Sequence, residues 1–219
     1  MKNKFNTLSV DRGNVNSTLT TKMNQEITEK QKNKCYSCGV GLEVESKLHK
    51  DGDDLYALCP LCYYPQNLND VDGNNLIILL PEISQTELNV LQRALAVVDY
   101  QIINMIKSID EGKKVGQSYE ISELKDTIDI LNIILKERAD FADTYYSKGC
   151  SNIDIVCNGL QSLSDSEYDA RVKGIYGLRM YHDMSMYENH LKYWSVSFNK
   201  YKVENWKNLI ISTAKRINK

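Results

Sequence analysis

The chain has 219 residues, which suits one large domain or two small ones and is enough to bury a hydrophobic core. Hydrophobic residues make up 42% and charged residues 26%, and the three prolines and eleven glycines exclude collagen-like and Pro/Gly-rich disordered classes. The formal net charge of −2 gives no overall attraction to nucleic acid, and the lack of a long apolar run or a secretory signal predicts a cytoplasmic protein without direct membrane insertion.

The first segment, residues 1–34, is rich in Asn, Thr, Ser and Lys and shows no clear hydrophobic period. We therefore expect a polar, flexible N-terminal arm. Its Lys30, Lys32 and Lys34 could form a basic contact patch, although a solvated run of charge is the simpler interpretation.

Four of the six cysteines form two pairs, Cys35-x2-Cys38 and Cys59-x2-Cys62, with twenty residues between the pairs. In a reducing cytoplasm this spacing indicates a metal site rather than a disulfide framework. Four thiolates fill the tetrahedral shell of zinc and leave no position for a water, so we expect one structural Zn²⁺. An iron centre of the rubredoxin type and unligated thiols are the alternatives.

The residues between the cysteine pairs predict a β-hairpin. A strand-like stretch over 42–48 and a short strand over 55–58 lie on either side of the turn sequence KDGDD. Two cysteine knuckles around a hairpin are typical of a zinc ribbon or treble clef. A buried strand over 76–80 follows and ends at Pro81, so we expect the zinc module to span residues 35–83.

A helix is predicted to begin after Ser84, which forms a capping box with Glu87. Apolar residues then recur with helical spacing at Leu88, Leu91, Leu95, Val98, Ile102, Met105 and Ile109. A second helix repeats the pattern at Ile121, Leu124, Ile128, Leu131 and Leu135. Because the link contains glycine and is short, we expect an antiparallel helix pair over 84–147, with a coiled-coil dimerisation surface as the alternative.

The last part, residues 148–219, is predicted to be an aromatic-rich helical segment that completes a helical body over 84–219. A second capping box, Ser164 with Glu167, begins a helix that reaches about Leu178, and a last helix is expected from about Val203 to Ile217. Nine of the nineteen aromatic residues lie between positions 168 and 206 and are interleaved with Lys and Arg. Core and surface roles, a protein-binding surface, and stacking on single-stranded nucleic acid all fit this pattern.

No catalytic residues can be assigned. The three histidines, His49, His182 and His190, are too few and too scattered for a catalytic set, and no Gly-rich phosphate loop is present. Zinc-stapled HNH nucleases hold a ββα catalytic unit beside such knuckles, but that unit needs a histidine base, and none lies between His49 and His182. Residues 35–147 carry a net charge of −10, which disfavours binding to phosphates. Activity as an HNH-type endonuclease, or nucleic-acid binding by another kind of zinc protein, is kept as the alternative to the function that the following resemblance implies.

The stretch LCPLCYYPQNLNDVDGNNLIILLPEISQTELNVLQRALAV, Leu58 to Val97, resembles the IcmJ/DotN family of the Dot/Icm type IVB secretion system. The resemblance covers roughly residues 35–100, and its specific part is the second cysteine pair with LLPEISQTELN. It implies an α+β fold with a small four-cysteine zinc module (HNH-like, ββα) followed by a mostly helical body, and no enzymatic activity. By this resemblance Cys35, Cys38, Cys59 and Cys62 are the zinc ligands.

The same resemblance implies a place in a secretion coupling complex. Members of the family bind the C-terminal extension of the coupling ATPase DotL, beside DotM and the IcmS–IcmW adaptor. The complex recruits effector proteins for export. We therefore expect a cytoplasmic scaffold subunit that is recruited to the inner membrane through its partners and binds no nucleic acid.

Overall fold

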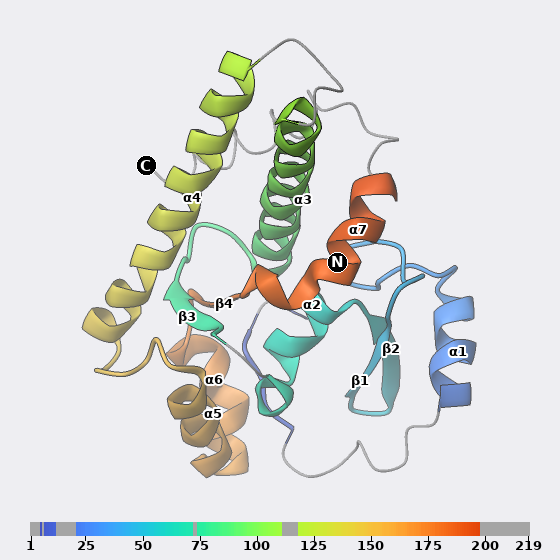
Figure 1. Cartoon of the computed structure of the whole chain (residues 1–219). Coiled ribbons are helices and arrows are strands. Elements are labelled where there is room, and N and C mark those ends of the chain that lie inside the picture. The colour runs from blue at the N-terminus through green and yellow to red at the C-terminus, as the bar shows by residue number, and fades with distance from the viewer. Residues whose placement is uncertain (1–4, 6, 12–20, 72–73, 111–117, 198–219) are drawn as a thin grey trace. The chain divides into compact units, whose positions relative to one another are not determined.

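The computed structural model describes residues 5, 7–11, 21–71, 74–110 and 118–197, and this part of the chain is mixed α/β (Figure 1). It divides into two compact units. Unit 1 is Met1–Asn89 with Arg138–Asp183, and unit 2 is Val90–Glu137 with Met184–Lys219. The helix expected from about Val203 to Ile217 lies outside the described residues.

Unit 1 contains two small antiparallel sheets and most of the short helices. One sheet pairs β1 (Lys47–Asp51) with β2 (Asp54–Leu58), and the other pairs β3 (Leu76–Leu79) with β4 (Leu178–Tyr181). The helices of this unit are α1 (Thr21–Lys30), α2 (Pro60–Tyr63), α5 (Ile153–Ser162) and α6 (Asp165–Gly174), with 3-10 turns η2 (Tyr64–Gln66) and η3 (Leu68–Asp70). Its core cluster includes Leu68, Ile77, Val156, Leu160 and Met180.

The N-terminal segment differs from the flexible arm that composition suggests. Residues 5 and 7–11, which we call the strap, lie outside the helices and strands, and their Leu8 and Val10 side chains belong to the core cluster of unit 1. Thr21–Lys30 forms α1, whose buried residue is Thr28. The composition conceals these contacts because only three apolar side chains of the strap, Phe5, Leu8 and Val10, are buried.

The first strand of the hairpin lies later in the chain than expected, over Lys47–Asp51 instead of 42–48. The reason is that Leu42 and Gly41 pair with the chain before the first cysteine. The Leu42 amide donates to the Asn33 carbonyl at 3.0 Å, and Lys34 forms an isolated β-bridge with Gly41. The predicted turn is present at Gly52, whose φ of +62° suits glycine.

Strand β4 was not expected, because the sequence suggested a helix reaching about Leu178. Helix α6 ends at Gly174, and Gly177 then takes a φ of +90°, which favours glycine. The chain continues into β4, which pairs with β3 in the register Leu76–Tyr181 to Leu79–Leu178. All four residues of β4 are buried, so no alternating pattern marks the strand in the sequence. This pairing places residues 138–183 in unit 1 rather than in a separate helical body.

Unit 2 contains most of α3 (Gln85–Asp110) and α4 (Ser118–Tyr145), with the 3-10 turn η4 (Met184–Tyr187) and α7 (Glu188–Ser197). Figure 1 shows α3 and α4 running in opposite directions, and an ion pair of 2.9 Å joins Lys125 to Asp99. Trp194 of α7 is buried, with the Arg93 guanidinium 5.7 Å from its ring centre. Both predicted capping boxes are confirmed, at Ser84 and at Ser164.

The predicted apolar face of α3 is buried only in part. Leu95, Val98 and Ile102 are buried, but the Met105 side chain is 45% exposed. Its neighbours Ile103 and Ile106 are exposed as well. Of the helices in the described ranges, none is both long enough and apolar enough to cross a membrane.

His182 directly follows β4 and is fully buried. Burial lowers the pKa of its imidazole to about 3, because the charged form would lose its hydration, and a hydrogen bond with the Leu61 backbone opposes the shift only partly. The folded state therefore holds His182 neutral, whereas the unfolded chain takes up a proton near pH 6.5. The contribution to stability is complete above this value and is lost as the pH falls from about 6.5 towards about 3.

We therefore expect the free energy of unfolding to fall by about 2 kcal/mol between about pH 7 and pH 5 through this group. Urea unfolding at the two pH values measures the change. The His182→Gln variant, which keeps a neutral polar side chain of similar size, should lack this component. An identical pH dependence in both proteins would show that His182 is not the group responsible.

Candidate metal centre

The four predicted metal ligands come from two turns on either side of the β1–β2 hairpin. Cys35 and Cys38 lie in a tight turn, closed by hydrogen bonds from the Cys35 amide to the Val40 carbonyl and from the Gly39 amide to the Cys35 carbonyl, both 2.8 Å. Gly39 has a φ of +71°, which lets the chain reverse directly after the cysteine pair. Cys59 precedes α2 as its N-cap, and Cys62 lies in α2 itself.

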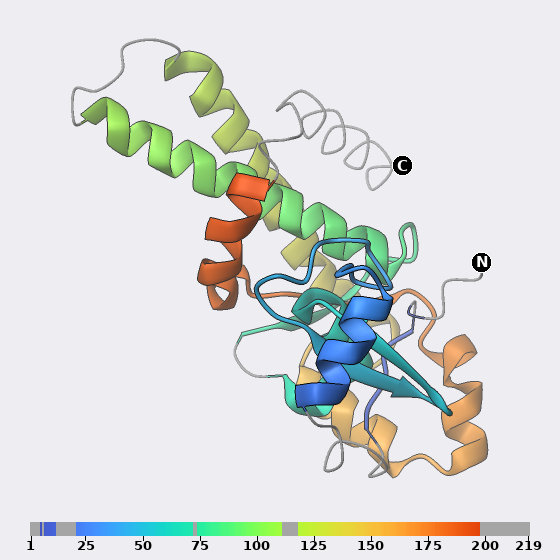
Figure 2. The same ribbon diagram turned by 90° about the vertical axis from the view of Figure 1, so that its right-hand side faces the viewer.

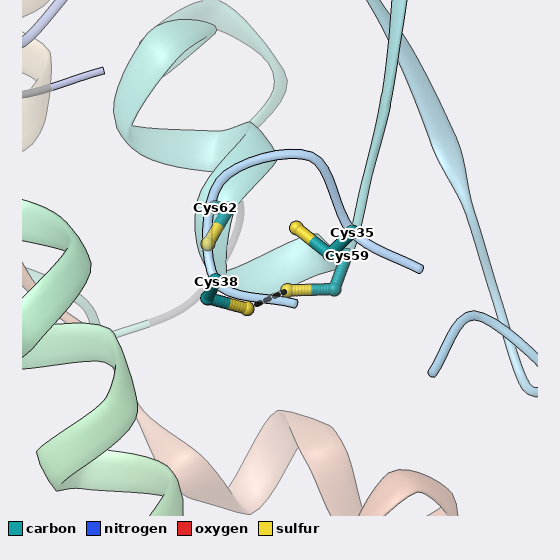
Figure 3. A group of neighbouring side chains, drawn as sticks. All are labelled: Cys35, Cys38, Cys59 and Cys62. Atoms are coloured by element: carbon teal, nitrogen blue, oxygen red, sulfur yellow. Dashed lines mark hydrogen bonds between the residues drawn. The ribbon is translucent and has the colours of Figure 1, made fainter. Parts of the chain in front are cut away.

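The structure brings all four cysteine sulfurs together, as Figure 3 shows. The four Sγ atoms lie within 4.8 Å of one another, and Cys38 Sγ is 3.7 Å from Cys59 Sγ. A tetrahedral site with metal–sulfur bonds of about 2.3 Å has sulfur–sulfur edges of about 3.8 Å. The 3.7 Å between Cys38 Sγ and Cys59 Sγ is too long for a disulfide bond and matches this expected sulfur–sulfur edge. The group could therefore hold one metal ion.

Burial disfavours the charged thiolate form of these cysteines unless a cation is bound. Cys35, Cys59 and Cys62 are buried and Cys38 is partly exposed. Hydrogen bonding with Cys35 and Cys38, together with burial, raises the pKa of both Cys59 and Cys62 well above the ordinary thiol value. Four thiolates so close together would repel one another, and a bound cation offsets this repulsion.

A buried chain of amide side chains links the cysteines to the second sheet of unit 1. Asn89 Nδ2 donates to Cys62 Sγ at 3.4 Å, and Gln85 Nε2 donates to Asn89 Oδ1 at 2.8 Å. Gln85 also pairs with Met180 of β4, donating to its carbonyl at 2.9 Å and accepting from its amide at 2.8 Å. Such partners orient metal ligands and tune their charge.

Sequence reasoning did not identify these supporting residues, since a single Asn or Gln in a helix has no local signature. Gln31 was missed in the same way. Its side chain donates to the Ala57 carbonyl and accepts from the Ala57 amide, both at 2.9 Å, and so extends the hydrogen bonding of β2 next to Cys59. Ser37, between the first two cysteines, hydrogen bonds to Thr86 of α3 at 2.8 Å.

The remaining cysteines and His49, which could also have been metal ligands, lie outside the four-cysteine group. Cys150 and Cys157 belong to the hydrophobic core of unit 1, where burial raises the pKa of both thiols. His49 is half-buried in β1, and its Nδ1 accepts a hydrogen bond of 3.1 Å from Asn67 Nδ2. Within the described residues, the four-cysteine group is the one cluster of His, Cys, Asp and Glu side chains with the geometry of a metal site.

Comparison with known proteins finds no family model that matches the chain and no significant match among curated proteins. Four sulfur atoms within 4.8 Å of one another, with an amide donor to one of them, have the arrangement of a group that could hold one metal ion.

The first prediction from this site concerns metal content. We expect the purified chain to hold about one metal ion, and Cys59→Ser to lose it, because a hydroxyl is a poor replacement for a buried thiolate. The melting temperature should fall by about 10 °C or more. Cys157→Ser is the matched control, since it removes a buried thiol outside the group and should retain the ion. Retention of the ion by Cys59→Ser would contradict the assignment.

A second prediction concerns Asn89. Replacing it with alanine removes the amide donor to Cys62 and should weaken metal affinity about tenfold or more. Competition with a chromophoric chelator measures the affinity, and Asn104→Ala, an exposed position on the same helix, is the control. Equal affinities in the two variants would show that the contact with Cys62 does not support the metal.

Proposed function

We propose that the chain is a non-enzymatic scaffold subunit of a type IVB secretion coupling complex, stabilised by one structural zinc ion. The observation that carries the proposal is the buried cluster formed by Cys35, Cys38, Cys59 and Cys62. With four sulfurs around one centre, a zinc ion has no position left for a substrate or water, which is typical of a structural site. The resemblance of residues 58–97 to the IcmJ/DotN family supports the choice of complex.

The fold around the cluster supports a treble-clef or HNH-like module as part of this proposal. One cysteine pair lies in a loop before the β1–β2 hairpin, and the other lies at the start of α2 directly after it. A hairpin flanked by a loop knuckle and a helical knuckle is the arrangement expected for such a module. In this proposal the module has kept its zinc as a structural element and performs no catalysis.

The proposed partner is the C-terminal tail of a coupling ATPase of the DotL type. Residues 35–147 carry a net charge of −10, which suits a segment with basic side chains. Unit 2 also exposes apolar side chains that a partner could cover, namely Ile103, Met105 and Ile106 on α3 and Ile130 and Ile133 on α4. Binding to the ATPase tail would recruit a cytoplasmic protein to the inner membrane and help the complex to collect effectors.

Isothermal titration of the full chain with the ATPase tail from the same organism tests the proposal. We expect saturable binding at tens of micromolar protein or below, because a tail segment that buries about 1,200 Å² or more forms a stable complex. Association should slow as salt rises, while dissociation changes little.

The controls address the nucleic-acid alternative. A duplex oligonucleotide should give no comparable heat, and plasmid DNA should remain uncut with Mg²⁺, Mn²⁺ or Ni²⁺. No binding of the tail would contradict the scaffold function. Metal-dependent nicking that persists through purification, or equally tight binding of the duplex, would favour the HNH nuclease function instead.

A further inference from the structure

The strap of unit 1, residues 5 and 7–11, is held as an extended peptide between two walls (the dark blue segment in Figure 2). One wall is the η2–η3 segment. The Ser9 amide donates to the Pro65 carbonyl and the Leu68 amide donates to the Ser9 carbonyl, both at 3.0 Å. On the same side, the Asp11 amide donates to Asn69 Oδ1 at 2.8 Å. These contacts are hydrogen bonds to the backbone of the strap, of the kind that a neighbouring β-strand would make.

The other wall consists of side chains from α6. The Tyr168 hydroxyl accepts from the Val10 amide and donates to the Val10 carbonyl, both at 3.0 Å. The Arg171 guanidinium lies over the Tyr168 ring at 3.8 Å, and its Nε donates to the Leu8 carbonyl at 3.3 Å. Successive residues of the strap thus bond alternately to opposite walls, which is the pattern of a β-strand.

Three side chains of the strap enter buried positions. Leu8 and Val10, two residues apart, are 1% and 5% exposed in the core cluster of unit 1. Phe5 packs edge-on against Tyr36, His49 and Tyr56, with ring centres between 5.6 and 5.9 Å apart. The strap thus places an aromatic residue against Tyr36, His49 and Tyr56 and aliphatic residues three and five positions later in the core cluster.

Helix α6 buries little of its own surface. None of its side chains is buried, although Tyr168 packs partly against the core cluster. Its hydrogen bonds to other elements in unit 1 include those from Tyr168 and Arg171 to the strap. A surface helix with little buried area opens at lower cost than the buried strands β3 and β4.

We propose that the groove between η2–η3 and α6 is a peptide-binding site, that the strap is its internal ligand, and that α6 covers the bound segment. The ligand in trans is an extended peptide with the strap's pattern, an aromatic residue followed by aliphatic residues at positions +3 and +5. Such a peptide binds by displacing the strap. The inference does not depend on the secretion role or on the ATPase tail.

The test uses the full chain with a protease site inserted between Asn16 and Ser17, outside the strap and α1, and a fluorescein-labelled peptide of residues 5–11. After cleavage, fluorescence anisotropy should show saturable binding of the peptide. The uncut chain should bind at least about tenfold more weakly, because a tethered strap competes at an effective concentration in the millimolar range. Equal binding by the cut and uncut chains would overturn the proposal.

Substitutions in the peptide and in the chain test which residues form the binding site. In the peptide, replacing both Leu8 and Val10 with Asp should abolish binding, because neither buried pocket accepts a charge. In the cut chain, Tyr168→Phe removes the hydroxyl that pairs with Val10 and should weaken binding about tenfold. Tyr176→Phe, at a residue that is 65% exposed, is the matched control and should bind as the unmodified cut chain does. Equal binding by Tyr168→Phe and Tyr176→Phe would overturn the proposal.

Should the cut chain fail to fold, hydrogen exchange in the uncut chain decides the question. The amides of Ser9, Val10 and Leu68 should exchange together through a local opening, faster than the Ile77 and Leu80 amides of the β3–β4 region. Exchange of all these amides at one common rate, through global unfolding alone, would show that the strap is a permanent part of the core and would overturn the proposal.

Discussion

The convergence of four cysteine sulfurs on one buried point is the constraint on which unit 1 depends. One pair precedes the β1–β2 hairpin in the chain and the other follows it, and three of the four thiols are buried. Hydrogen bonding among the crowded thiols, together with burial, raises the pKa of Cys59 and Cys62 and so disfavours their ionisation in the absence of a cation. A bound metal ion would replace this mutual repulsion with four metal–sulfur bonds, and its binding energy would then add to the folding free energy of the module.

The influence of that centre extends beyond the hairpin through specific contacts. Asn89 connects Cys62 to Gln85, and Gln85 pairs with the backbone of Met180 in β4. Met180 in turn belongs to the same core cluster as Leu8 and Val10 of the strap. Unit 1 is thus assembled from segments distant in sequence, and polar contacts define their positions while apolar burial supplies most of the stability.

Features with strong local signals could be predicted from the sequence. The cysteine spacing, the capping boxes at Ser84 and Ser164 and the strand ending before Pro81 each involve neighbouring residues, and the structure contains all of them.

The missed features depend on distant partners. Strand β4 is buried on both faces and so shows no alternation, the strap needs only Phe5, Leu8 and Val10, and Asn89 matters only because Cys62 lies beside it. The helical spacing of apolar residues also predicts that Met105 is buried, but its side chain is exposed. Such spacing shows which face of a helix is apolar, but it does not show how far along that face another element packs against it.

The central claim is that Cys35, Cys38, Cys59 and Cys62 together bind one structural zinc ion. X-ray absorption spectroscopy of the purified chain at the zinc edge tests it most directly, because the spectrum reports both the identity of the metal and its ligands. We expect a single shell of four sulfur atoms at about 2.3 Å from the zinc, with no nitrogen or oxygen ligand. A shell containing nitrogen or oxygen, or a folded chain in which no metal is detected, would contradict it.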